Sequence, residues 1–130
     1  MRNFTILLIS AICIGGISVR SQQFDDTAFC ETMHKFAANA NKDAGSLVDA
    51  HTRNDGMAVL CATKVVDFKK FIDVPQDAMR PGWKDRKSDQ WRNIYCNDPF
   101  WRSAIQNGWT VATTIVTVDG DRTWIEAVCK

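Results

Sequence analysis

The spacing of apolar residues predicts a helix near the start of the mature chain. In the stretch that begins at Asp26, apolar side chains recur every three to four residues, at Phe29, Met33, Phe36 and Ala40. This period is typical of an amphipathic helix with one core-facing stripe. We expect the carboxylate of Asp26 to cap the first turn of this helix.

After Gly45 the period shortens to that of a β-strand. Two apolar-rich runs flank "NDG" at residues 54–56. Because glycine tolerates positive φ, an Asp-Gly pair is favoured in two-residue hairpin turns. The pattern therefore predicts a β-hairpin over residues 46–66 with its turn at Asp55–Gly56.

The C-terminal half repeats the same types of element. A polar helix is predicted over residues 83–95. A second helix should begin with Asp98 as its N-cap and Pro99 at its first position, and Gly108 should end it in the left-handed conformation. A second hairpin is expected to turn at Asp119–Gly120.

These elements predict an α+β fold with two related α-β-β units. Each unit opens with an aromatic residue followed by a cysteine, at Cys30 and Cys96, and closes with a strand-borne cysteine, at Cys61 and Cys129. We expect a four-stranded antiparallel sheet, made of two β-hairpins and covered by helices.

The first residues have the features of a secretory signal peptide. A basic start is followed by a short apolar run and then by small residues, and cleavage after Ser21 would leave Gln22 at the N-terminus. Residues 1–21 are thus predicted to be a signal peptide and residues 22–130 a single domain. Lipidation at Cys13 is the alternative, but Ile12 is bulky where a small residue is normally required. We expect a periplasmic or secreted protein with no stable membrane anchor after cleavage.

Four cysteines remain in the mature chain, and in a small exported domain this indicates two disulfides. The C-x-x-C and H-x-x-x-H spacings of zinc sites are missing, so no metal or cofactor is predicted. Packing each helix back along the following strand separates the cysteines within each unit. This geometry favours links between the units, Cys30–Cys129 and Cys61–Cys96.

Charge gives no indication of a nucleic-acid partner. Loss of Arg2 and Arg20 with the signal peptide reduces the 16 basic residues to 14, against 15 acidic residues. A near-neutral chain lacks the basic surface that binds phosphate backbones or anionic membranes.

The strongest candidate for a binding surface is aromatic. Pairing the second hairpin through a two-residue turn places Ile115 opposite Trp124, with Trp109 on the same face. If this face is exposed, it would bind another protein or a second copy of the chain, with Arg53 and Arg102 as polar anchors. Tryptophans stacking on sugar rings would instead make a glycan-binding module, and coverage by the helix over residues 83–95 would make the face part of the core.

An enzymatic interpretation depends on "DAHTRND". Asp49 and His51 alternate along one predicted strand face, where the carboxylate could orient the imidazole as a general base. An exposed strand with alternating polar residues has the same sequence pattern without any catalytic role. We therefore expect a non-enzymatic module, with a small periplasmic enzyme that uses Asp49 and His51 as the alternative.

Two segments resemble a widespread family of small, uncharacterised, exported bacterial proteins. The first is "SLVDAHTRNDG" and the second is "CNDPFWRSAIQNGWTV", which has the C-x-D-P-x-x-R helix motif before a strand pair. The matching positions are Val48, Asp49, Thr52, Arg53, Cys96, Asp98, Pro99, Arg102 and Gly108. The resemblance implies an α+β envelope protein and no particular reaction. The four mature cysteines and five tryptophans depart from the family pattern.

Overall fold

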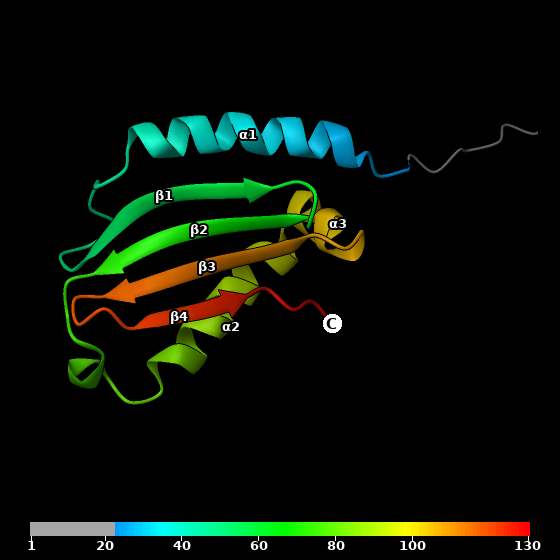
Figure 1. The fold of residues 1–130 in the computed structure, drawn as a ribbon. Helices are drawn as coiled ribbons and strands as arrows, with labels where there is room; N and C mark the ends of the chain where they lie inside the picture. Colours follow the sequence, from blue (N-terminus) through cyan, green and yellow to red (C-terminus); the bar gives the residue numbers. More distant parts are fainter. Residues whose placement is uncertain (1–22) are drawn as a thin grey trace, which may run out of the picture.

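The computed structural model describes residues 23–130, and the predicted signal peptide with Cys13 lies outside the described residues. Figure 1 shows one four-stranded sheet with its helices. Along the chain the elements are α1 (Asp26–Lys42), β1 (Thr52–Leu60), β2 (Val65–Ile72), the short 3-10 helix η1 (Gln76–Ala78), α2 (Trp83–Asn97), α3 (Pro99–Gln106), β3 (Thr110–Thr117) and β4 (Arg122–Glu126). Between residues 23 and 130, no helix combines the length and apolarity needed to cross a membrane.

The predicted α+β class, the four strands and the two hairpins are confirmed, but the sheet is mixed. Its strands lie in sequence order, and β1–β2 and β3–β4 are antiparallel pairs. The central pair, β2–β3, is parallel, so the expectation of a fully antiparallel sheet was wrong. The physical reason is that α2 and α3 carry the chain back along the sheet between β2 and β3, as parallel neighbours require.

The helices cover one face of this sheet. The apolar side of α1 buries Phe29, Met33 and Ala37 against β1 and β2, and the indole rings of Trp83 and Trp91 on α2 pack against β3 and β4. Figure 1 shows α1 running along β1 while α2 crosses obliquely behind β3 and β4. The opposite face of the sheet carries none of the helices formed by residues 23–130.

The first hairpin turns later than the sequence pattern predicted. Asp55 and Gly56 lie inside β1 as a bulge, where the register shifts between Asn54 and Met57, and the turn spans residues 61–64. Asn41 at the end of α1 stabilises the bulge. Its side-chain oxygen accepts a hydrogen bond from Met57 N at 2.8 Å, and its amide donates to Met57 O. Gly56 has φ +95°, and a Cβ there would collide with Asn41, so this glycine permits a close approach to α1 rather than a turn.

Both disulfides lie within a unit, which corrects the predicted pairing of Cys30 with Cys129 and of Cys61 with Cys96. The bonds are Cys30–Cys61, with 5.9 Å between Cα atoms, and Cys96–Cys129, with 5.5 Å. Because β1 continues through Gly56, its end returns to the start of α1 and brings Cys61 to Cys30. In the second unit Cys96 lies in the last turn of α2, which packs against β4, and the chain leaving β4 carries Cys129 to it.

The second hairpin has a four-residue loop in place of the predicted two-residue turn. Thr114 lies opposite Trp124, and Ile115 lies opposite Thr123. Thr117 N donates to Asp121 O at 3.0 Å, which closes the loop. Since side chains alternate along a strand, this shift of one residue places Ile115 and Trp124 on opposite faces of the sheet.

The helix caps agree with the sequence in one case and differ in the other. The carboxylate of Asp98 accepts a hydrogen bond from Phe100 N at 2.9 Å, Pro99 is the first residue of α3, and Gly108 has φ +91°, all as predicted. For α1 the N-cap is Asp25, which accepts from Ala28 N at 3.0 Å. Asp26 is therefore available for a tertiary contact.

We expect peptide mapping of the unreduced mature protein to recover Cys30–Cys61 and Cys96–Cys129. Replacing Cys96 and Cys129 together with alanine should lower the free energy of unfolding by ~2–5 kcal/mol, because the unfolded chain loses a cross-link. Denaturant melts against the unmodified protein measure this. Recovery of a Cys30–Cys129 peptide would contradict the pairing.

Asp98→Ala should lower the free energy of unfolding by ~0.5–2 kcal/mol, because Phe100 N loses its acceptor at the helix start. Asp98→Asn is the matched control, since asparagine caps a helix about as well and should retain most of the stability. Equal loss in both variants would show that the negative charge, rather than the cap, matters.

Candidate binding groove

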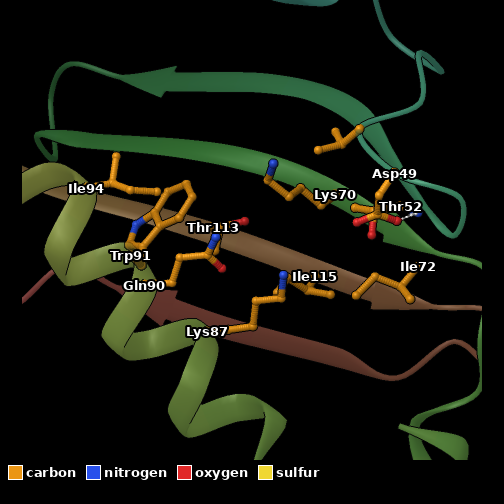
Figure 2. A pocket seen from close by; sticks show the side chains of 11 residues that line it. Asp49, Thr52, Lys70, Ile72, Lys87, Gln90, Trp91, Ile94, Thr113 and Ile115 are labelled. Carbon is orange, nitrogen blue, oxygen red and sulfur yellow. Dashed lines mark hydrogen bonds between the residues drawn. The ribbon is translucent and has the colours of Figure 1, made fainter. Parts of the chain in front are cut away.

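A groove opens on the helix-covered side of the sheet between α2 and the loop that follows α1. Its floor is made by β1, β2 and β3, one wall by α2, and the other wall by residues 48–49 (Figure 2). It exists because the helices diverge. The rings of Phe29 and Phe100 hold α1 to α3, with 5.5 Å between centroids, while α2 slants away across β3 and β4. The lining residues are Val48, Asp49, Thr52, Lys70, Ile72, Lys87, Gln90, Trp91, Ile94, Thr113 and Ile115.

The apolar part of the groove is partly exposed at its rim. Ile94 on α2 is 50% exposed and Val48 in the loop is 52% exposed, whereas Ile115 and Trp91 beneath them are buried. The indole of Trp91 donates to Val111 O at 3.0 Å, and this bond fixes the ring against the floor. Buried apolar side chains with exposed apolar residues at their edge are typical of a surface that a partner covers.

Two lysine ammonium groups face the groove. Lys70 rises from β2 and Lys87 reaches in from α2, and both side chains are half-buried (Figure 2). Burial lowers the pKa of Lys70, and the neighbouring charge of Lys87 lowers it further, while Asp49 opposes both effects. The folded chain therefore favours the charged form of Lys70 less than water does.

Asp49 shapes the wall of the groove through the backbone. Its Oδ1 accepts hydrogen bonds from His51 N at 2.9 Å and from Thr52 N at 2.8 Å. These bonds, led by the one from His51 N, lower the pKa of the Asp49 carboxyl, and the charge of Lys87 acts in the same direction. The carboxylate thus stabilises the conformation of this loop. Its hydrogen bond with His51 is to the backbone N–H, whereas a catalytic pair would use the imidazole ring.

Two of the predicted binding residues are in the core, which corrects the expectation of one exposed aromatic face. Trp109 is 3% exposed, and its Nε1 donates to Asp26 Oδ1 at 2.8 Å. Ile115 is 2% exposed, because the hairpin register turns it toward α2. Asp26 also bonds Lys64 at 2.9 Å, and Lys64 and Trp109 together lower the pKa of its carboxyl.

The other three predicted binding residues are exposed but do not form one surface. Trp124 on β4 is 49% exposed on the open face of the sheet. Arg53 lies on the same face but on β1, with its Cζ 4.9 Å from the ring centroid of Phe71. Arg102 belongs to α3 and lies beside the C-terminus, with Nη2 3.5 Å from Lys130 O.

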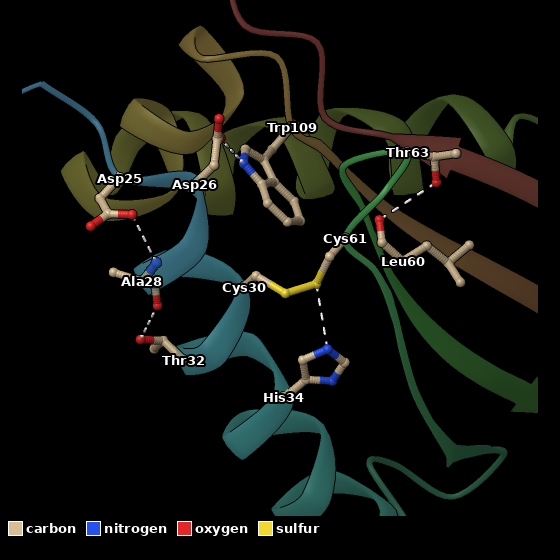
Figure 3. The surroundings of a disulfide bond; sticks show 10 residues. All are labelled: Asp25, Asp26, Ala28, Cys30, Thr32, His34, Leu60, Cys61, Thr63 and Trp109. Atoms are coloured by element: carbon tan, nitrogen blue, oxygen red, sulfur yellow. Dashed lines mark hydrogen bonds between the residues drawn. A yellow bond between two sulfur atoms is a disulfide. The ribbon is translucent and has the colours of Figure 1, made fainter.

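The Cys30–Cys61 bridge has a histidine beside it. His34 Nε2 lies 3.4 Å from Cys61 Sγ, and the possible ligand atoms of the three side chains are all within 4.8 Å of one another (Figure 3). Because the two sulfur atoms share a covalent bond, neither is a thiolate. This cluster is a metal ligand set only after reduction.

The sequence analysis missed the residues that define the groove. In "VVDFKKFI" the alternation of strand β2 places Lys70 with Phe68 and Ile72 on the covered face, and Lys69 on the open face. Strict period-2 counting over this segment finds Lys70. Lys87 lies in the polar helix predicted over residues 83–95, and the sequence alone does not show which of its side chains meet the sheet.

Two solved structures share this fold. A protein from Pseudomonas aeruginosa, described as secreted, aligns with a TM-score of 0.61 at 11% identity, over 82% of this chain and 94% of its own. A pilotin from the type 2 secretion system of Vibrio vulnificus aligns with a TM-score of 0.50 at 12% identity, over 81% of this chain and 91% of its own. No protein-family model and no curated protein matches this chain. At these identities the likeness concerns the fold.

Lys70→Met should raise the free energy of unfolding, by up to ~1 kcal/mol, because it removes a charge that burial disfavours and keeps the apolar stem. The gain should be complete below the lowered pKa of Lys70 and should fade as pH rises toward the unfolded value of about 10.4. Denaturant melts as a function of pH measure it.

Lys69→Met is the matched control, because the side chain of Lys69 is exposed on the open face of the sheet. This substitution should change the free energy of unfolding by less than about 0.5 kcal/mol. Equal effects of the two substitutions would contradict the assigned environment of Lys70.

Proposed function

We propose that this chain is a small exported, non-enzymatic module that binds another protein through the groove between α2 and residues 48–49. The observation that carries the proposal is the half-exposed pair Val48 and Ile94 above a buried apolar floor. In a small domain, exposed apolar residues such as these lower solubility unless a partner covers them at least part of the time.

Export is supported by the cysteines. Two disulfides in a domain of this size are typical of oxidising compartments such as the periplasm or the extracellular space. The descriptions of the two structural neighbours, one as secreted and one as a pilotin of a secretion system, agree with this location. Cleavage of residues 1–21 belongs to the same proposal.

The groove suits a segment of a protein better than a compact small molecule. It follows α2 from Lys87 to Ile94, which is about 10 Å at the helical rise per residue. A neighbouring depression shares Asp49, Thr52, Ile72 and Lys87 and extends the path toward His51 and Met79. An elongated, open-ended path of this kind accommodates a chain that enters at one end and leaves at the other.

The test removes the apolar rim without adding charge. Replacing Val48 and Ile94 with serine should weaken partner binding roughly tenfold or more, since two apolar contacts are lost. Leu60 and Val118 are 55% and 51% exposed and lie outside the groove, so their double serine variant is the matched control. Circular dichroism checks that both variants fold.

Affinity capture from envelope extracts of the source organism, quantified by mass spectrometry, compares the two variants with the unmodified protein. We expect proteins that the control retains and the groove variant loses. If only Trp124→Ala abolishes capture, the partner binds the open face of the sheet, and this outcome would contradict the proposal that the groove is the binding site. If no protein partner is captured and the unmodified protein binds glycan arrays in a way that Trp124→Ala abolishes, the glycan-binding alternative is favoured.

A further inference from the structure

Neither ammonium group in the groove forms an ion pair with an acidic side chain of the described residues. Among residues 23–130 the ion pairs are Asp26–Lys64 and Asp89–Arg92, and neither involves Lys70 or Lys87. Desolvating an ammonium group without an opposite charge is unfavourable, and buried charges in proteins are normally paired. Lys70 and Lys87 are half-buried, so their unpaired charges make this part of the groove favourable for an anionic group.

Asp49 does not balance the charges of both lysines. Its Oδ1 is held by the backbone N–H groups of His51 and Thr52, and its charge only partly offsets the lowering of the Lys70 pKa by burial and by Lys87. Two ammonium groups against one carboxylate leave the groove with a net positive charge. A second carboxylate between Lys70 and Lys87 would pair with both ammonium groups.

The surroundings of the two lysines limit the kind of molecule that brings this carboxylate. Thr113 and Ile115 lie on the floor beside Lys70, and Trp91 and Ile94 line the wall beyond Lys87 (Figure 2). A small, strongly hydrated anion would leave these apolar groups uncovered. An acidic side chain with aliphatic neighbours in a peptide covers them and pairs with the ammonium groups at once.

We propose that the groove recognises an acidic peptide segment, in which an Asp or Glu side chain binds between Lys70 and Lys87 and flanking apolar side chains cover Ile94 and Val48. This inference rests on the proposed function and adds the chemistry of the partner. Charge attraction draws the segment into the groove, and the apolar contacts keep it there.

Selection from a phage-displayed library of random 12-residue peptides on the immobilised mature protein tests the proposal. Peptides are kept only if the Val48→Ser, Ile94→Ser variant fails to bind them and the Leu60→Ser, Val118→Ser control retains them. We expect these groove-dependent peptides to contain an Asp or Glu flanked by apolar residues. Each is then synthesised with an amidated C-terminus, together with a version in which the acidic residue is replaced with Asn or Gln.

Titration calorimetry with these peptides should give a roughly tenfold or greater loss of affinity when the acidic residue is neutralised, as expected for a charge-assisted contact. Lys70→Met and Lys87→Met should cause a similar loss, and neutralising the peptide should have little further effect in either variant. Lys69→Met should bind like the unmodified protein.

The outcomes separate this inference from the proposed function. Groove-dependent peptides whose affinity is unchanged by neutralisation or by Lys70→Met would overturn the carboxylate contact and leave the groove as the binding site. Binding that requires an unmodified C-terminus would assign the contact to a terminal carboxylate and overturn the side-chain assignment. Failure to obtain any peptide that depends on Val48 and Ile94 would contradict both.

Discussion

The parallel pairing of β2 with β3 is the constraint on which the rest of the structure depends. Two adjacent parallel strands cannot be joined by a tight turn, so η1, α2 and α3 together return the chain to the edge where β2 began. Because this connection crosses the face that α1 already covers in part, α1, α2 and α3 lie on one side, and no helix of the described residues covers the other side. The groove is the part of the floor that α1 and α2 leave uncovered.

The two disulfides make this arrangement rigid in a small domain. Cys30–Cys61 fastens α1 to the end of β1, and Cys96–Cys129 fastens the end of α2 to the chain that leaves β4. Each bridge holds a helix to its own hairpin, and aromatic contacts around Phe29 and Phe68 join the two units.

The charges divide into groups that stabilise the fold and groups that do not. Asp26 serves the fold, since its carboxylate holds both Lys64 and the indole of Trp109. Lys70 has the opposite character, because its charge is disfavoured where it lies. Charged groups that cost stability and lack a partner concentrate at functional sites, which is why the groove, rather than the exposed Trp124, is the better candidate.

Local signals in the sequence determined the local structure. Asp98, Pro99 and Gly108 fix the start and end of α3 through a cap, a pre-formed φ and a left-handed glycine, all effects within a few residues. The α+β class and the number of disulfides also follow from periodicity and from the cysteine count. The tertiary structure alone decided which cysteines pair, which face Ile115 and Trp124 occupy, and that Asp55–Gly56 forms a bulge against Asn41 instead of a turn. These features depend on strand register and on contacts between distant segments, and because a shift of one residue reverses the face of every side chain in a strand, no local pattern could fix them.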